Sequence, residues 1–115
     1  MMFPGFGTGR IFLCREAVDM RKSFDTLAAL VSSKLEENPL SGAMFVFLNK
    51  PRNRVKILFF DRDGYWLMSK RLERGTFALP DGNNVKQSLD PGTLAMLLEG
   101  IKVVKKSKRF SLCSI

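Results

Sequence analysis

The chain has 115 residues, 45% of them hydrophobic, and this composition predicts one folded domain with a modest core. The chain's 19 Lys and Arg against 11 Asp and Glu give a net charge of +8, which favours nucleic acid, and after it an anionic membrane surface, as a partner. Basic charge can also serve solubility alone. With no histidine, the composition excludes His-based metal sites and Ser-His or Cys-His catalytic pairs.

The first half of the chain predicts a strand, a helix and a second strand. Residues 1–9 are Gly-rich and predict a flexible lead-in, and residues 10–14 have the β-branched and aromatic content of a strand. Asp19 is placed to cap a helix over roughly residues 20–36, where apolar residues recur at helical spacing. Residues 44–48 are apolar on both faces, which predicts a central strand or a strand at an oligomer interface.

Residues 54–77 predict a β-hairpin closed at Asp63-Gly64, a pair that tolerates the positive φ angles of a type I′ turn. In that register Lys56 lies opposite Arg71, a like-charge pair that is unfavourable unless an anion covers it. Directly opposed residues share a face, so we expect a core face with Lys70 as its charged misfit and Val55, Ile57, Phe59, Trp66, Met68 and Leu72 as its apolar members. The other face carries Arg54, Lys56, Arg62 and Arg71 around Phe60, Tyr65 and Leu67.

The rest of the chain predicts a short edge segment, a strand, a second helix and a basic tail. Residues 77–80 are the candidate edge segment, because Pro80 cannot sit inside a ladder, and residues 85–89 are the candidate strand. Asp90-Pro91 combines an N-cap with proline at the first helical position. Residues 102–115 form the tail, with the cations Lys105, Lys106, Lys108 and Arg109.

These elements predict the α+β class, with a single domain over residues 10–101. We expect an antiparallel sheet of about four or five strands, with a central meander, packed with two main helices. Cys14 and Cys113 lie too far apart for a redox or metal motif, and the chain shows no secretory signal and no apolar run of bilayer length. We therefore expect a soluble, cytoplasmic, nucleoid-associated protein with no cofactor, no metal and no membrane.

The positive functional signal is the density of cations over residues 50–74, where eight Lys or Arg accompany three acids. Such cations bind phosphates and release counterions. Tyr65 could stack on an unpaired base or pack within the fold, whereas Phe60 and Trp66 are expected to pack. No arrangement of carboxylates predicts catalysis. The predicted nucleic-acid-binding residues are Lys50, Arg52, Arg54, Lys56, Arg62, Tyr65, Lys70, Arg71, Arg74, Lys105, Lys106, Lys108 and Arg109.

The order of several short motifs resembles a known family. The resemblance is carried by residues 19–31 (DMRKSFDTLAALV), 45–47 (FVF), 56–58 (KIL), 61–64 (DRDG), 70–77 (KRLERGTF) and 94–101 (LAMLLEGI). Together they are similar to the TnpB-type accessory protein, the second reading frame, of bacterial insertion sequences of family sixty-six, over residues 10–101. The chain departs from that pattern at Phe59-Phe60 and Leu79-Pro80, where a Trp pair and Trp-Pro are common.

The resemblance implies a small cytoplasmic protein that assists transposition beside a separate catalytic transposase, and it supplies no catalytic residues. Together with the charge, it predicts a non-catalytic accessory factor whose cations hold the DNA backbone. The alternative is an adaptor that binds the transposase or a sister accessory protein without contacting DNA. RNA as the nucleic acid and self-association of the chain both stay open.

Overall fold

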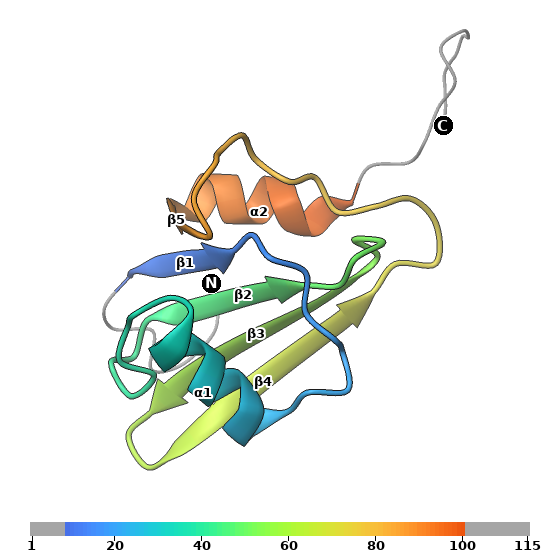
Figure 1. The fold of residues 1–115 in the computed structure, drawn as a ribbon. Helices are drawn as coiled ribbons and strands as arrows, with labels where there is room; N and C mark the ends of the chain where they lie inside the picture. The colour runs from blue at the N-terminus through green and yellow to red at the C-terminus, as the bar shows by residue number, and fades with distance from the viewer. Residues whose placement is uncertain (1–8, 101–115) are drawn as a thin grey trace, which may run out of the picture.

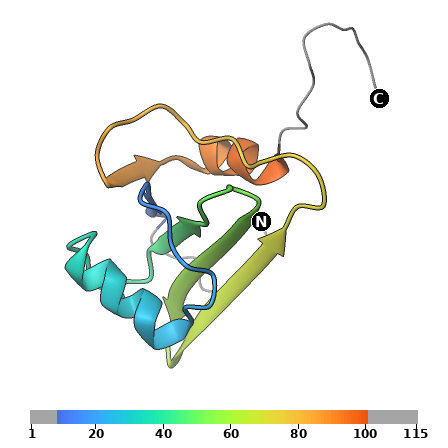
Figure 2. The ribbon, with the colours of Figure 1, turned by 45° about the vertical axis from the view of Figure 1, so that its right-hand side comes forward.

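A five-stranded sheet with one helix packed on each face makes up the computed structural model, which describes residues 9–100 (Figures 1 and 2). The strands lie in the order β4-β3-β2-β1-β5. This arrangement confirms the predicted α+β class. In chain order the elements are β1 (Ile11–Cys14), α1 (Phe24–Ser33), β2 (Met44–Leu48), β3 (Arg54–Asp61), β4 (Gly64–Arg71), β5 (Lys86–Leu89) and α2 (Pro91–Glu99).

The sheet is mixed, and not wholly antiparallel as expected. Strands β2, β3 and β4 form the predicted antiparallel meander, and β5 runs antiparallel to β1. Strand β1, however, pairs with β2 in parallel, with Ile11 beside Met44. The cause is α1, which carries the chain back to the starting end of β1 before β2 begins, as parallel neighbours require.

Strand β2 is the centre of the molecule, as its sequence predicted, and all five of its residues are buried. On one face Met44, Val46 and Leu48 pack in a cluster with Leu94 and Leu97 of α2. On the other face, Phe45 and Phe47 pack in a cluster with Leu27 and Val31 of α1 and with Leu35, which follows the helix. A sheet covered on both faces requires such continuous apolar strands.

The pairing of β3 with β4 is shifted by two residues from the predicted register. Its two-residue loop is Arg62-Asp63, with Arg62 at φ 55°, and Asp61 pairs with Gly64. Lys56 therefore lies opposite Ser69, and the like-charge pair is Arg54 with Arg71. A shift of two residues preserves the faces. The face shared by Val55, Ile57, Phe59, Met68 and Leu72 is thus confirmed as a core face, the one under α2.

Trp66 is not a core residue, contrary to prediction. Its side chain is 51% exposed, because β4 is an edge strand. The indole ring stacks on Phe59 with 6.4 Å between ring centroids, and its Nε1 donates to Asp61 Oδ2 at 3.4 Å. Phe60, expected to pack, is half-buried and meets Tyr65 edge-on.

Helix α1 is shorter than predicted and Asp19 is not its N-cap. The helix begins at Phe24 after the N-cap Ser23, because the Asp19 carboxylate accepts hydrogen bonds from the backbone N and the guanidinium of Arg21 instead. Helix α2 starts as predicted, and Asp90 Oδ1 accepts from Thr93 N at 2.7 Å. Residues 77–80 form no strand.

Several predictions fall on residues 1–8 and 101–115, outside the described residues. They include the lead-in, the tail cations Lys105, Lys106, Lys108 and Arg109, and Cys113. Cys14 is a buried free thiol, and burial raises its pKa. Across residues 9–100, neither helix has the length and apolar character needed to cross a bilayer.

Leu97→Ala should lower the free energy of unfolding by about 2–5 kcal/mol, because the leucine is 1% exposed and joins α2 to the sheet. The matched control is its neighbour Met96→Ala, which is 70% exposed and should change stability by less than about 0.5 kcal/mol. Urea unfolding followed by circular dichroism measures both. Equal losses from the two variants would contradict this packing of α2.

Candidate nucleic-acid interface

The turn between β2 and β3 is built around the side chain of Asn49. Its Oδ1 accepts hydrogen bonds from the backbone N of Asn53 and of Arg54, both at 3.0 Å, and its Nδ2 donates to Asn53 Oδ1 at 2.8 Å. Arg52 adopts a positive φ of 60° within this turn. The result is a fixed loop from which Lys50 and Arg52 project into solvent.

Backbone hydrogen bonds tie the segment that follows β4 to the same turn. Leu72 N donates to Asn53 O at 2.8 Å, and Phe77 N donates to Arg52 O at 2.7 Å. Arg74 lies between these two anchored points. Arg71 ends β4 directly opposite Arg54, and its guanidinium binds Glu73 Oε2 at 3.1 Å. One end of the hairpin therefore gathers cations from three segments.

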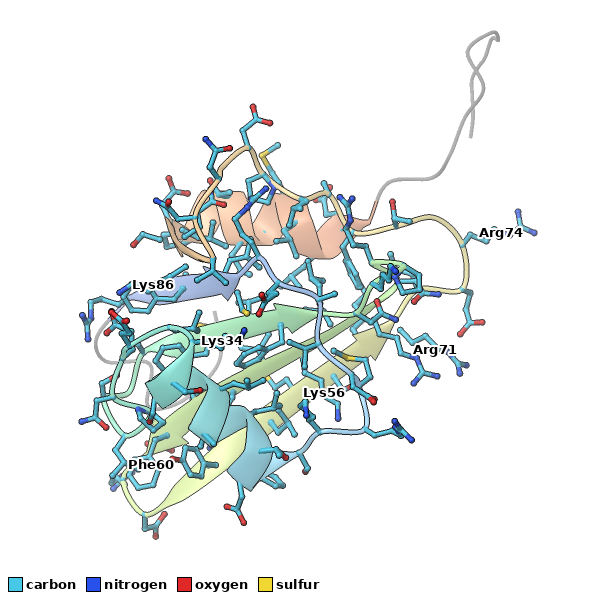
Figure 3. The ribbon with its side chains drawn as sticks, viewed as in Figure 1. Lys34, Lys56, Phe60, Arg71, Arg74 and Lys86 are labelled. Atoms are coloured by element: carbon cyan, nitrogen blue, oxygen red, sulfur yellow. The ribbon has the colours of Figure 1, made fainter. Side chains whose placement is uncertain are left out.

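We call this cluster the basic end surface, and its members, all exposed, are Lys50, Arg52, Arg54, Arg71 and Arg74. Figure 3 shows Arg71 and Arg74 at one end of the molecule and Phe60 at the other. Two shallow hollows of about 420 and 360 Å³ are lined in part by Lys50, Arg54 and Arg71, and both have Met20 and Arg54 in their walls. The acids that line them are Asp19 and Glu73, each already bound to an arginine.

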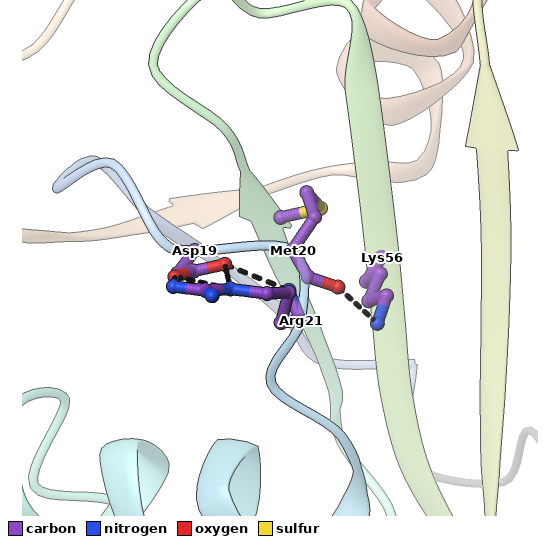
Figure 4. A network of polar contacts seen from close by, with 4 residues as sticks. All are labelled: Asp19, Met20, Arg21 and Lys56. Atoms are coloured by element: carbon purple, nitrogen blue, oxygen red, sulfur yellow. Dashed lines mark hydrogen bonds and ion pairs between the residues drawn. The ribbon is translucent and has the colours of Figure 1, made fainter.

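Lys56 anchors a loop rather than projecting into solvent. The half-buried side chain donates from Nζ to Met20 O at 2.7 Å (Figure 4). It also donates to Lys22 O at 2.7 Å. These carbonyls belong to the turn in which Asp19 binds Arg21. The hydrogen bonds from Arg21 hold the pKa of Asp19 well below its usual range. Arg21, whose side chain is 91% exposed, directly follows Asp19 and Met20, which line one of the two hollows.

Arg21 was absent from the predicted set. The sequence held a signal for it: two cations follow Asp19 where the first turn of a helix would disfavour them.

Three other predicted residues lie away from the basic end surface. Lys70 is on the α2 face, and its Nζ donates to Leu98 O at 2.9 Å, near the helix C-terminus where a cation is favourable. Arg62 is exposed at the opposite end of β3, about 26 Å from Arg54 at the usual rise of a strand. Tyr65 packs with the α1-side cluster, and burial followed by nearby Asp25 raises its pKa.

Comparison with known proteins identifies the family. The family model for IS66 Orf2-like proteins matches residues 9–108. The chain belongs to this family. It is also similar to two uncharacterized proteins of Sinorhizobium fredii, with 35% identity to y4hO over 100 residues, 87% of each chain. Identity to y4jC is 33% over 101 residues, which are 88% of this chain and 86% of the relative. No solved structure matches.

Membership in the IS66 Orf2-like family links the chain to transposition of an insertion sequence as an accessory protein, as the motif resemblance predicted. Within residues 9–100, no group of His, Cys, Asp or Glu could hold a metal ion. What this IS66 Orf2-like domain offers a partner at its basic end is therefore charge and hydrogen-bond donors.

Lys56→Met should lower the free energy of unfolding by about 1–3 kcal/mol, because it leaves Met20 O and Lys22 O without their charged donor. Lys50→Met removes the same charge from an exposed side chain and should cost less than about 0.5 kcal/mol. Chemical denaturation compares the two variants. If Lys56→Met is as stable as Lys50→Met, the lysine does not hold the loop.

Proposed function

We propose that the chain is a non-catalytic accessory factor of insertion-sequence transposition that holds DNA by its backbone at the basic end surface. The observation that carries the proposal is that cations from the β2–β3 turn, the end of the β3–β4 hairpin and the segment after it meet at one end of the molecule. Family membership supplies the context of transposition, and the charge of this surface supplies the mode of binding.

Most cations of this surface have no side-chain partner among residues 9–100. Among the described residues, the side chains of Lys50, Arg52, Arg54 and Arg74 make no ion pair or hydrogen bond, whereas Arg71 has Glu73. Arg54 and Arg71 also lie directly opposite each other, an arrangement that costs stability unless an anion lies between them. A phosphate is an anion that arginine pairs can bind with good geometry.

The surface favours contact with the phosphate backbone over stacking on bases. None of its members is aromatic, and Tyr65 packs against the α1 side of the sheet instead. Proteins that read unpaired bases present aromatic rings beside their cations. Contacts to phosphates fix position and carry no sequence information of their own. We therefore expect binding to duplex DNA with little sequence preference from this surface.

The non-catalytic part of the proposal rests on the residue types present. The chain has no histidine. The two acids at the basic end, Asp19 and Glu73, are each bound to an arginine, so neither is placed to act as a general base. The chemistry of strand transfer would then belong to a separate transposase, with this chain as a DNA-holding subunit.

Binding to duplex DNA should weaken steeply with salt, because five phosphate contacts predict a slope of about −4 to −5 in a plot of log affinity against log salt. The double variant Arg52→Gln/Arg54→Gln removes two contacts, so its slope should be less steep by about 2. It should also bind more weakly at every salt concentration. Fluorescence anisotropy with a labelled duplex measures both quantities.

The matched control removes two charges elsewhere, by Lys34→Gln with Arg62→Gln. Both residues are exposed and lie outside the basic end surface, so the slope should stay at the wild-type value. Equal slopes for the two double variants would show that net charge alone governs binding. If the wild-type chain ignores duplex DNA at low salt yet co-purifies with the transposase, the adaptor function replaces this proposal.

A further inference from the structure

We propose that two copies of this chain pair through the outer edge of β4, antiparallel, so that their two sheets become one. Strand β4 lies at the end of the sheet and pairs only with β3. Among the described residues, no backbone hydrogen bond joins β4 to any segment on its outer side. The proposal does not depend on DNA binding.

The outer edge of β4 is unusually open for pairing. It has eight residues in an uninterrupted register with β3, without proline and without a bulge. Natural proteins commonly protect such edges with short strands, proline or bulges. The opposite edge shows that protection, because β5 has four residues and is followed closely by Pro91. Self-pairing is therefore expected at β4 and not at β5.

The ladder fixes which groups of β4 point outward. Leu72 N donates to Asn53 O, so even-numbered residues in this register direct their backbone groups toward β3. Alternation then directs the N–H and C=O of Tyr65, Leu67, Ser69 and Arg71 away from β3. An antiparallel copy of the same strand would satisfy all of these groups.

The charge along the hairpin edge selects a second copy in antiparallel orientation as the partner. At the turn end, Asp61 and Asp63 outnumber Arg62, and at the other end the cations Lys70, Arg71 and Arg74 outnumber Glu73. Antiparallel pairing brings the acidic end of one copy toward the basic end of the other. A parallel arrangement would place like charges together, which is unfavourable.

A two-fold axis through Met68 gives the best side-chain pairs. Trp66 then lies opposite Lys70 of the second copy, Tyr65 opposite Arg71, and Leu67 opposite Ser69. The first two pairs set a cation against an aromatic ring, which is attractive. An axis at Lys70 would instead oppose two lysines. The Met68 register also covers the side chain of Trp66, which is 51% exposed in the single chain because β4 is an edge strand.

Trp66 is the chain's single tryptophan, so it reports directly on this interface. Sedimentation equilibrium from micromolar to millimolar protein should show the mass double. Over the same range, Trp66 emission should shift to shorter wavelength and acrylamide quenching should fall. A mass that never doubles overturns the proposal, and so does a doubling that leaves Trp66 emission unchanged.

Ser69→Pro removes an outward N–H without touching the β3 ladder and should leave a folded monomer at every concentration. Ser69→Thr keeps the N–H and should dimerise as the wild type does. Trp66→Lys changes an exposed side chain, places it opposite Lys70, and should weaken dimerisation at least tenfold, which keeps the test decisive if Ser69→Pro fails to fold. Dimerisation of Trp66→Lys at wild-type strength would overturn the proposal.

Disulfide cross-linking tests the register in a Cys113→Ser background, where only buried Cys14 remains. Met68→Cys sits on the proposed axis at a pair without backbone hydrogen bonds, where Cα atoms lie about 4.5 Å apart, within reach of a disulfide. Met68→Cys should give a covalent dimer on oxidation, and Trp66→Cys should not. The reverse result would overturn the register.

Discussion

The uninterrupted β3–β4 ladder determines where the cations of the proposed DNA-binding surface lie. Eight residue pairs run from Arg54 with Arg71 to Asp61 with Gly64. Because the register fixes both the end and the face on which each side chain emerges, Arg54 and Arg71 meet at one end while Arg62 is carried to the other. The same ladder assigns Val55, Ile57 and Phe59 to the α2 core. A different register would disperse the basic end surface.

Among residues 9–100, some cations support the structure and others have no side-chain partner. Lys56 and Lys70 both donate to backbone carbonyls, the first holding the loop before α1 and the second binding near the end of α2. Lys50, Arg52, Arg54 and Arg74 have no such partner among the described residues. The net charge of the chain therefore overestimates how many cations can bind a polyanion, because only side chains without a partner in the fold are available to its phosphates.

Much of the fold could be predicted from local sequence. The apolar run of β2, the alternation in β3 and the Asp90-Pro91 helix start each carry a strong local signal. The predictions that were wrong depended on tertiary structure, which local sequence does not show. Arg62 takes the positive φ expected of glycine, Asp19 binds Arg21 instead of capping a helix, and Trp66 sits beyond the cover of α2. For the site, sequence density predicted the cations of the β2–β3 turn, but no local pattern revealed that Lys56 turns inward.

The central claim is that the cations of the basic end surface contact DNA phosphates. Amide NMR shifts during titration with a short duplex test it most directly, because they report on each position separately. The account predicts shifts at Lys50, Arg52, Arg54, Arg71 and Arg74 at low salt, which salt should abolish, while Arg62 and Tyr65 at the far end stay unchanged. Shifts centred on the far end, or none at low salt, would contradict it.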